Sequence, residues 1–250
     1  MVQAQVVSTH QKQPKPPCVD LTLLLDSNRV QLYPGDDPFT FHQVNSYCHK
    51  PGMNITIGSL SFGSVHTGTH LDAPFHFISN GKTIDQIPLS DLIGPALVID
   101  LSGKELQPRQ QITWADLSSW HPHLREGVIV VIHTGWSERH WCTPQYYHHP
   151  YLAADVAEGL VASGVRVLGL DTLSPDETPF DDIGGENGLE FHEIFLGAGG
   201  AIAENLTNLS ALTEEEGTAA GGRGTWIVNF IPLNLSGSDG SPIRAFAYRA

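Results

Sequence analysis

The residues of this sequence best suited to chemistry lie close together between Gly63 and Phe77, in the stretch GSVHTGTHLDAPFHF. Three histidines and one aspartate follow one another there at spacings of four, two and four positions: His66, His70, Asp72 and His76. Imidazole nitrogens and carboxylate oxygens together suit a borderline divalent ion such as zinc. Such an ion activates water and polarises a carbonyl group, and a further histidine can accept and return a proton. The stretch therefore predicts a metal-dependent hydrolytic site.

Regular secondary structure cannot bring these four side chains together. A helix would place His66 and His70 on one face and point the other two elsewhere, and Pro74 argues against a helix through the segment. A straight strand would separate His66 from His76 by about 33 Å, at roughly 3.3 Å per residue. Gly68 permits a positive φ, so the residues predict a tight turn on which the side chains converge. A structural or incidental role for the four residues is the alternative.

The composition fits a globular chain with enough apolar material for a core. The chain has 250 residues, of which 40% are hydrophobic and 16% are charged, and its formal net charge is −14. This negative charge opposes binding to nucleic acid and to acidic membrane surfaces. No apolar run approaches the roughly 20 residues that a membrane span needs. We therefore expect neither a nucleic-acid partner nor a membrane partner.

The cysteines and the N-terminal segment indicate a cytoplasmic protein. The cysteines are odd in number and widely spaced, which favours free thiols in a reducing compartment over a disulfide framework or a metal site: Cys18, Cys48 and Cys142. The first residues, MVQAQVVSTHQKQPKPP, contain no apolar core of signal-peptide length. They are polar and rich in proline toward their end, so we expect a mobile tail over residues 1–17 and one domain over residues 18–250.

Strand signals outnumber helix signals along that domain. Apolar runs and alternating patterns predict strands over residues 18–26, 39–48, 53–65, 95–103, 127–135, 165–172, 201–206, 224–235 and 242–250. Helix patterns cover residues 113–120, 151–164 and 189–200, with Thr113 suited to an N-cap and Gly164 placed to end the second helix. Only some strands alternate with helices, so we expect an α/β domain with a mixed β-sheet core and flanking helices.

The stretch HTGTHLDAPFH resembles the motif H-x-G-T-H-x-D-x-P-x-H of the cyclase-like metal-dependent hydrolases, a family that includes bacterial kynurenine formamidase and isatin hydrolase. Further segments are similar to that family in the same order: VDLTLLLDSNRVQLYPGDDPF, HTGWSERHW, LGLDTLSPD, AIAENLTNL and PLNLSGSDGSPIRAFA. The resemblance thus covers about residues 19–247. It implies a single domain of the swivelling β/β/α type and a homodimer or homotetramer, with loops that cross between subunits near the site.

The resemblance also implies a role for each residue of the site. The ligands of one divalent ion correspond to His66, His70 and Asp72. His76 corresponds to the catalytic histidine of the motif. In members with two ions, the same aspartate bridges to a second ion that is held by a histidine and a glutamate twelve residues apart. His192 and Glu204 have that spacing, so we expect one or two divalent ions, either zinc or manganese.

Aromatic residues near these segments predict a pocket for a flat substrate, although aromatic residues beside strands more often pack in a core. The candidates are Tyr33, Phe62, Phe75, Phe77 and Trp136. Tyr33 and Phe62 are favoured as substrate-binding residues. Formamidases of the family often have tryptophan where Tyr33 precedes the sequence PGD, and this departure weakens the case for a kynurenine-type substrate.

These observations together favour a metal-dependent amidohydrolase that opens the C–N bond of an arylformamide or a cyclic amide. Two alternatives stay open. The first is a lactone hydrolase, or a secondary-metabolite cyclase or dehydratase that uses the metal as a Lewis acid. The second is a non-catalytic metal- or metabolite-binding protein of the same fold. His76 argues against the second alternative, because a protein that only binds its ligand needs no base beside the metal.

Overall fold

The structure is a computed structural model that describes residues 18–45, 55–179, 188–213 and 226–250. The tail expected over residues 1–17 lies outside the described residues, as does Cys48. The boundaries of the single domain expected over residues 18–250 stay a prediction. Within the described part of the chain, no helix is long and apolar enough to cross a membrane.

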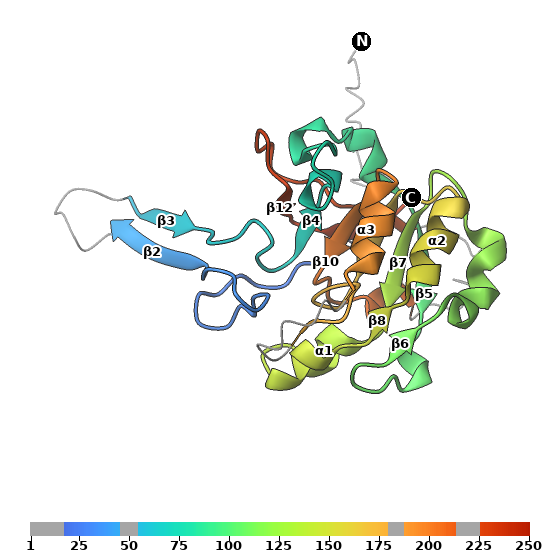
Figure 1. The fold of residues 1–250 in the computed structure, drawn as a ribbon. Coiled ribbons are helices and arrows are strands. Elements are labelled where there is room, and N and C mark those ends of the chain that lie inside the picture. The colour runs from blue at the N-terminus through green and yellow to red at the C-terminus, as the bar shows by residue number, and fades with distance from the viewer. Residues whose placement is uncertain (1–17, 46–54, 180–187, 214–225) are drawn as a thin grey trace, which may run out of the picture.

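A nine-stranded mixed sheet forms the centre of the fold, and four neighbouring strands in its middle run parallel (Figure 1). These are β5 (Ile93–Asp100), β7 (Ile129–His133), β9 (Val167–Leu170) and β10 (Ala201–Glu204). Antiparallel strands extend the sheet beyond β5, in the order β11 (Trp226–Asn229), β13 (Phe246–Arg249) and β1 (Cys18–Asp20). Beyond β10 lie β4 (His70–Asp72) and then β12 (Gly240–Pro242), also antiparallel.

The sheet is buried on both faces. Alternate residues of β7 belong to two separate core clusters, Ile129 and Val131 to one and Val130 and Ile132 to the other. Because successive side chains of a strand point to opposite faces, the two clusters lie on opposite sides of the sheet. All residues of β7 are buried, which agrees with the uninterrupted apolar run that predicted a central strand.

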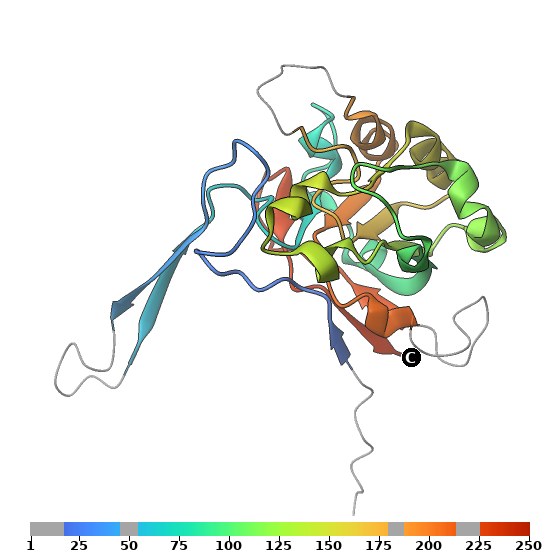
Figure 2. The same ribbon diagram turned by 90° about the horizontal axis from the view of Figure 1, so that it is seen from below.

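Helices α2 (Ala154–Ala162) and α3 (Glu190–Gly197) lie side by side over one face of the sheet (Figures 1 and 2). Their apolar residues share a core cluster with residues of β7, β9 and β10. Gly164, with φ of +84°, follows α2 and ends it as the sequence predicted. The shorter helices are α1 (Trp136–His140), α4 (Ser210–Thr213) and the 3₁₀ helices η1 (Pro74–His76), η2 (Ile84–Gln86), η3 (Leu89–Asp91), η4 (Ser102–Lys104), η5 (Trp114–His123) and η6 (Pro144–His148).

Two smaller strand pairs lie apart from the main sheet. Strands β6 (Gln111–Ile112) and β8 (Tyr151–Leu152) form a short parallel pair. Strands β2 (Thr40–Asn45) and β3 (Ile57–Ser61) form an antiparallel ribbon that stands out from the body of the molecule in both views (Figures 1 and 2). The predicted fold class, an α/β fold with a mixed sheet and flanking helices, is confirmed.

Candidate metal centre

The predicted turn is present. The four side chains lie on three short elements that follow one another in the chain: this turn, a strand and a 3₁₀ helix. Gly68 has φ of +65°, a left-handed conformation that favours glycine. Strand β4 follows and carries His70 and Asp72. Pro74 then begins the 3₁₀ helix η1, which ends with His76. Proline is tolerated at the first position of a helix because the N–H that it lacks would have no partner there.

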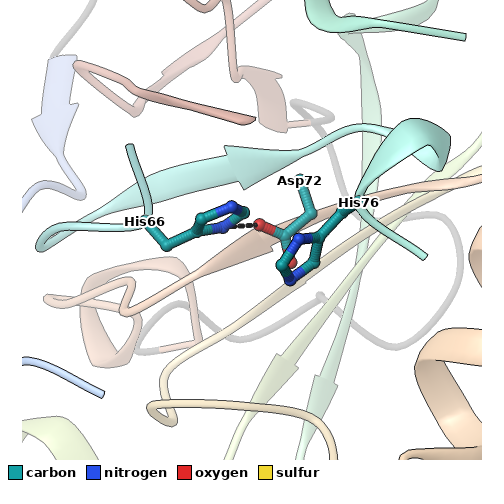
Figure 3. Close-up of side chains that lie close together, drawn as sticks. All are labelled: His66, Asp72 and His76. Carbon is teal, nitrogen blue, oxygen red and sulfur yellow. Dashed lines mark hydrogen bonds and ion pairs between the residues drawn. The ribbon is translucent and has the colours of Figure 1, made fainter. Parts of the chain in front are cut away.

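Asp72 lies at the centre of the site, buried, with each carboxylate oxygen facing a histidine. Its Oδ1 atom is 2.7 Å from Nδ1 of His66 and 3.2 Å from Nε2 of His70. Its Oδ2 atom is 3.5 Å from Nε2 of His192, which comes from α3. Figure 3 shows the Asp72 carboxylate close to the rings of His66 and His76. One carboxylate therefore lies between two sets of histidine nitrogens, as a bridging ligand would.

Strand β10 supplies a second buried carboxylate. The register of β10 against β4 places Glu204 opposite His70, so these two side chains lie on the same face of the sheet. The Oε2 atom of Glu204 is 3.4 Å from Nε2 of His70, and its Oε1 atom is 3.3 Å from Nε2 of His192. All five residues expected to bind metal thus meet in one cluster.

The ligand atoms fall into two groups that share Asp72. Within each group, the atoms lie within 4.8 Å of one another. The groups are His66, Asp72 and His76, and His70, Asp72 and Glu204. The resemblance to the family instead implies that His70 binds the same ion as His66. The distances from Asp72 Oδ1 to both rings are compatible with that assignment as well.

The ring nitrogens that face away from the cluster have acceptors of their own. Nδ1 of His70 donates to a backbone carbonyl oxygen at 2.8 Å, and Nδ1 of His192 donates to Asp176 at 2.6 Å. Nε2 of His66 donates to Asp239 at 3.0 Å. Because carbonyl and carboxylate oxygens only accept, each ring must carry a proton on its outer nitrogen. A neutral ring then presents a lone pair to the cluster, which is the form that binds a metal ion.

This donor set fits a divalent cation. The lone pairs on the inner nitrogens of the histidine rings face the Asp72 and Glu204 carboxylates. The nitrogen and oxygen atoms repel each other unless a proton or a metal ion lies between them. The Oε1 atom of Glu204 is buried and accepts no hydrogen bond from the described residues. A buried polar atom without a partner is costly, and coordination of an ion would satisfy it.

The pKa values of His66 and His70 also show that the cluster favours positive charge. Burial lowers the pKa of His66, but the neighbouring carboxylates, Asp72 first, outweigh it and raise the pKa to about 9. Burial likewise lowers the pKa of His70, and the Asp72 and Glu204 carboxylates raise it to about 10. In the metal-free protein these rings therefore hold protons at neutral pH, in the places that ligation would give to an ion.

His76 differs from the other histidines of the site. Its side chain is 30% exposed and lines the cavity beside the cluster. Burial lowers the pKa of His76 below its ordinary value, and the nearby rings of His66 and His192 lower it further. His76 is therefore neutral at pH 7 and can accept a proton.

A cavity of about 210 Å³ opens onto the cluster. Besides the histidines and carboxylates already described, its walls are formed by Tyr33, Asp36, Phe77, Leu173, Ser174 and Leu189. The ring of Phe77 stacks on that of His192, with ring centroids 4.7 Å apart and an interplanar angle of 11°. The cavity thus combines aromatic and aliphatic walls with a polar floor that can bind metal.

Two of the five aromatic candidates, Tyr33 and Phe77, line this cavity. Phe62 is not one of the described residues that line it, and its ring packs against Phe39 with the centroids 5.1 Å apart. Contact between Phe62 and a substrate stays a prediction. Of the other two candidates, Trp136 lies in a buried cluster and Phe75 lies at the surface.

Two residues of the site were missed in the sequence. Asp176 lies shortly after β9 and binds His192, whereas Asp239 immediately precedes β12 and contacts His66 and His76. Asp176 lies in the loop that follows the carboxyl end of the parallel strand β9, and loops at that edge of a sheet commonly carry site residues, a signal that could have found it. Asp239 lies in a turn rich in serine and glycine, and nothing in its surroundings distinguishes it from an ordinary turn residue.

Comparison with known proteins supports the interpretation of this cluster as a metal site. The family model described as "Putative cyclase" matches residues 19–177. A kynurenine formamidase of Bacillus cereus is 32% identical over 228 residues, which cover 91% of this chain and 95% of the relative. The structure of isatin hydrolase A from Labrenzia aggregata, bound to benzyl benzoate, is similar with a TM-score of 0.75 and 26% identity, covering 92% of this chain and 93% of that one. A predicted metal-dependent hydrolase from Bacillus stearothermophilus has a TM-score of 0.67 and 25% identity, covering 94% and 99%.

One of these relatives is named a formamidase and the other two are named hydrolases. They confirm the prediction that the protein is a hydrolase. Names that refer to metal dependence, together with the cluster around Asp72, support a divalent metal. The family model spans more than half of the chain, and the formamidase aligns with nearly all of it. The chain therefore belongs to the cyclase family that the motif HTGTHLDAPFH predicted.

Proposed function

We propose that the protein is a metal-dependent amidohydrolase that opens the C–N bond of an arylformamide or a cyclic amide. One observation carries this proposal. Inner ring nitrogens of three histidines converge on Asp72 and Glu204, and a fourth, neutral histidine, His76, lines the same cavity as this cluster. This arrangement places a donor set for a divalent ion beside a base that faces the space for a substrate.

In this proposal, His66, His70 and Asp72 would hold one ion. His192 and Glu204 would hold a second ion together with Asp72, whose two oxygens face the two sets of nitrogens. Nitrogen and oxygen ligands of this kind suit zinc or manganese. When bound, a divalent ion activates a water molecule and polarises the carbonyl group of the substrate.

His76 is the proposed catalytic base. It lines the cavity, and its low pKa keeps the ring neutral at pH 7. The ring accepts a proton from the attacking water and returns it to the leaving nitrogen as the C–N bond breaks. The products are a carboxylic acid and an amine, which stay in one molecule if the substrate is a cyclic amide.

The walls of the cavity favour a flat aromatic substrate. Tyr33 and Phe77 offer aromatic surfaces, and Leu173 and Leu189 add aliphatic ones. Aromatic rings prefer such surfaces for offset-stacked or edge-to-face contact. The names of the relatives agree with a flat aromatic substrate. One relative is a kynurenine formamidase, and the structure of an isatin hydrolase contains the product analogue thioisatinate.

The test is an assay of the purified protein with N-formylkynurenine, isatin and a simple lactone, after removal of metal and after reloading with zinc or manganese. We expect turnover of an amide substrate only in the loaded protein, and a loss of about 10²–10⁴-fold in kcat for His76→Ala. His123→Ala, which changes a partly exposed histidine at the end of η5 that does not line the cavity, is the matched control. Full activity of His76→Ala would contradict the role of the base.

The same assays decide between the proposal and its alternatives. Turnover of the lactone but of neither amide would favour a lactone hydrolase. Metal loading without turnover of any of the three substrates would contradict the amidohydrolase. That result would leave a cyclase or dehydratase, or a binding protein of the same fold, as the candidates.

We also propose that the protein forms a homodimer or homotetramer. The β2–β3 ribbon supports this proposal, because it stands out from the body and carries exposed large apolar side chains (Figure 2). These residues are Phe41, Val44, Ile57 and Leu60, each at least 45% exposed. An isolated two-stranded ribbon is marginally stable in water, and burial of these side chains against a second copy would stabilise it.

Light scattering coupled to size-exclusion chromatography tests the assembly. We expect an oligomer for the wild type and a smaller species for the double variant Phe41→Ser and Leu60→Ser, two residues that face each other across the ribbon. Leu233→Ser, which changes a leucine that is 53% exposed outside the ribbon, is the control. A monomeric wild type would contradict the assembly but not the hydrolase.

A cytoplasmic location remains our proposal. Cys18 and Cys142 are both exposed and unpaired in the structure. Exposed free thiols persist in a reducing compartment, whereas oxidising compartments favour disulfides. Fractionation of cells that produce the protein would test this proposal.

A further inference from the structure

We propose that Asp239 is a positioning residue, which holds the ligand His66 and the base His76 through one shared carboxylate oxygen. The Oδ2 atom of Asp239 lies 3.0 Å from Nε2 of His66 and 3.3 Å from Nδ1 of His76. This inference rests on the proposed function, because it assigns a further role within the same site. Asp239 is not one of the described residues that line the cavity, so it acts through the two rings and not on the substrate.

The shared oxygen fixes which nitrogen of each ring carries a proton. A carboxylate oxygen accepts, so His66 must donate from Nε2 and His76 must donate from Nδ1. In the neutral form of His66, Nδ1 then keeps its lone pair toward Asp72, 2.7 Å away, where a metal ion would be held. In neutral His76, Nε2 keeps the lone pair, as a base requires.

The two rings lie close enough for one residue to control both. Their centroids are 4.0 Å apart and their planes differ by 30°, so a rotation of either ring would push against the other. A single acceptor between the outer nitrogens therefore couples the orientation of the base to that of the ligand. Loss of this acceptor would allow both rings to turn or to exchange tautomers.

The backbone around Asp239 is built to hold this position. Ala73 donates its N–H to the carbonyl oxygen of Asp239 at 2.8 Å, directly after the strand that carries Asp72. The next residue, Gly240, pairs with Asp72 in the register of β12 against β4. Ile84 binds the carbonyl oxygen of the preceding residue at 2.8 Å. The carboxylate is thus anchored to the element that supplies the centre of the metal site.

Zinc binding and the tautomer of His76 test this inference without any substrate. We expect Asp239→Ala to weaken zinc binding about 10- to 100-fold, the usual effect of removing a carboxylate that orients a ligand histidine. In zinc-loaded protein with ¹⁵N-labelled histidine, NMR should show Nδ1 of His76 protonated in the wild type and a mixture of tautomers in Asp239→Ala. In the assay with substrate, kcat should fall with little change in KM.

Two further variants separate positioning from general damage to the turn. Asp85→Ala removes a carboxylate that binds the N–H of Gly237 in the same turn but touches neither histidine, and we expect near-normal zinc binding. Asp239→Asn keeps one oxygen that can accept, so it should recover part of the zinc affinity that Asp239→Ala loses.

Two results would overturn the inference. The first is wild-type zinc affinity together with an unchanged His76 tautomer in Asp239→Ala. The second is an equal loss of zinc affinity in Asp85→Ala, which would assign the effect to the turn. If the wild type binds zinc but hydrolyses none of the substrates, the proposed function fails, while zinc affinity and the His76 tautomer still decide the role of Asp239.

Discussion

The Nδ1 atom of His192 lies 2.6 Å from a carboxylate oxygen of Asp176, and the same carboxylate accepts hydrogen bonds from the backbone N–H groups of Phe191 and His192. These N–H groups belong to the first turn of α3, where they have no acceptor within the helix. Asp176 therefore caps α3 and orients the ring of a proposed ligand at the same time. We therefore expect the stability of α3 and the geometry of the proposed second ion site to depend on this one side chain.

Asp176→Ala should weaken the binding of the second metal ion and destabilise the fold together. We expect a loss of about 10- to 100-fold in affinity for that ion, because the ring of His192 loses its orienting acceptor. The lost cap should lower the free energy of unfolding by about 0.5–2 kcal/mol. Calorimetric titration with zinc and urea denaturation of the metal-free protein measure the two effects.

The control for this prediction is Asp155→Ala. Asp155 also accepts a backbone N–H, that of Trp114, but it lies outside the candidate metal centre. The Asp155→Ala variant should be less stable than the wild type and should bind zinc with unchanged affinity. Equal zinc affinity in Asp176→Ala and the wild type would refute the link between the cap and the second ion site.

The stability of the metal-free protein should fall as the pH rises. The pKa values of His66 and His70 in the folded protein are about 9 and about 10, above the value of about 6.5 for an unfolded histidine. A group whose pKa is raised on folding contributes stability that is complete below its unfolded pKa and is lost as the pH rises through its folded pKa. The melting temperature in the presence of a chelator should therefore decline between about pH 6.5 and pH 10.

Zinc should remove this decline. Protons compete with the metal for the ring nitrogens, so the affinity for zinc rises as the pH rises and the ion takes over the role of the protons. Thermal unfolding across this pH range, with chelator and with saturating zinc, gives the comparison. Parallel pH profiles in the two conditions would argue against His66 and His70 as metal ligands.

The sequence predicted the part of the site that is local in the chain. A turn, a short strand and a 3₁₀ helix that follow one another in the chain carry His66, His70, Asp72 and His76, so their spacing and Gly68 were sufficient to predict convergence. His192 and Glu204 were found only through the resemblance to a family. Their place depends on the pairing of β10 with β4 and on the packing of α3, which join segments far apart in the chain.

Residues that support the ligands were harder to predict, because their role follows from contacts between distant elements. Asp239 is separated from His66 by 173 positions, and only the pairing of β12 with β4 brings the two together. The same limit applies to the fold. The apolar runs of β5 and β7 predicted central strands, but no local pattern records that β4 and β12 complete the sheet beyond β10.

Gly240→Ala should displace His66 and weaken the first ion site. A Cβ at this position would lie 2.8 Å from Cε1 of His66 and 3.0 Å from the carbonyl oxygen of Leu71. The backbone cannot give way easily, because Gly240 pairs with Asp72 in the sheet. We expect zinc affinity to fall about tenfold or more at the site of His66, with a smaller effect at the second site.

Titration with zinc resolves the two sites when their affinities differ, and Gly103→Ala is the control. A Cβ at Gly103 would meet no atom within 4 Å, so this variant should bind zinc as the wild type does. Unchanged zinc binding in Gly240→Ala would mean that the ring of His66 can move aside without cost to the site. That result would count against His66 as a tightly held ligand.

Tyr146→Phe should lower the stability of the fold. The hydroxyl group of Tyr146 donates to Oδ1 of Asn205 at 2.7 Å, and both residues are buried. Removal of the donor leaves a buried acceptor without a partner, which costs about 1–3 kcal/mol of the free energy of unfolding. Urea denaturation measures the change, and Tyr248→Phe, a partly buried tyrosine of β13 whose ring packs on Phe246, is the control. A change below about 0.5 kcal/mol in Tyr146→Phe would mean that a water molecule takes the place of the hydroxyl group.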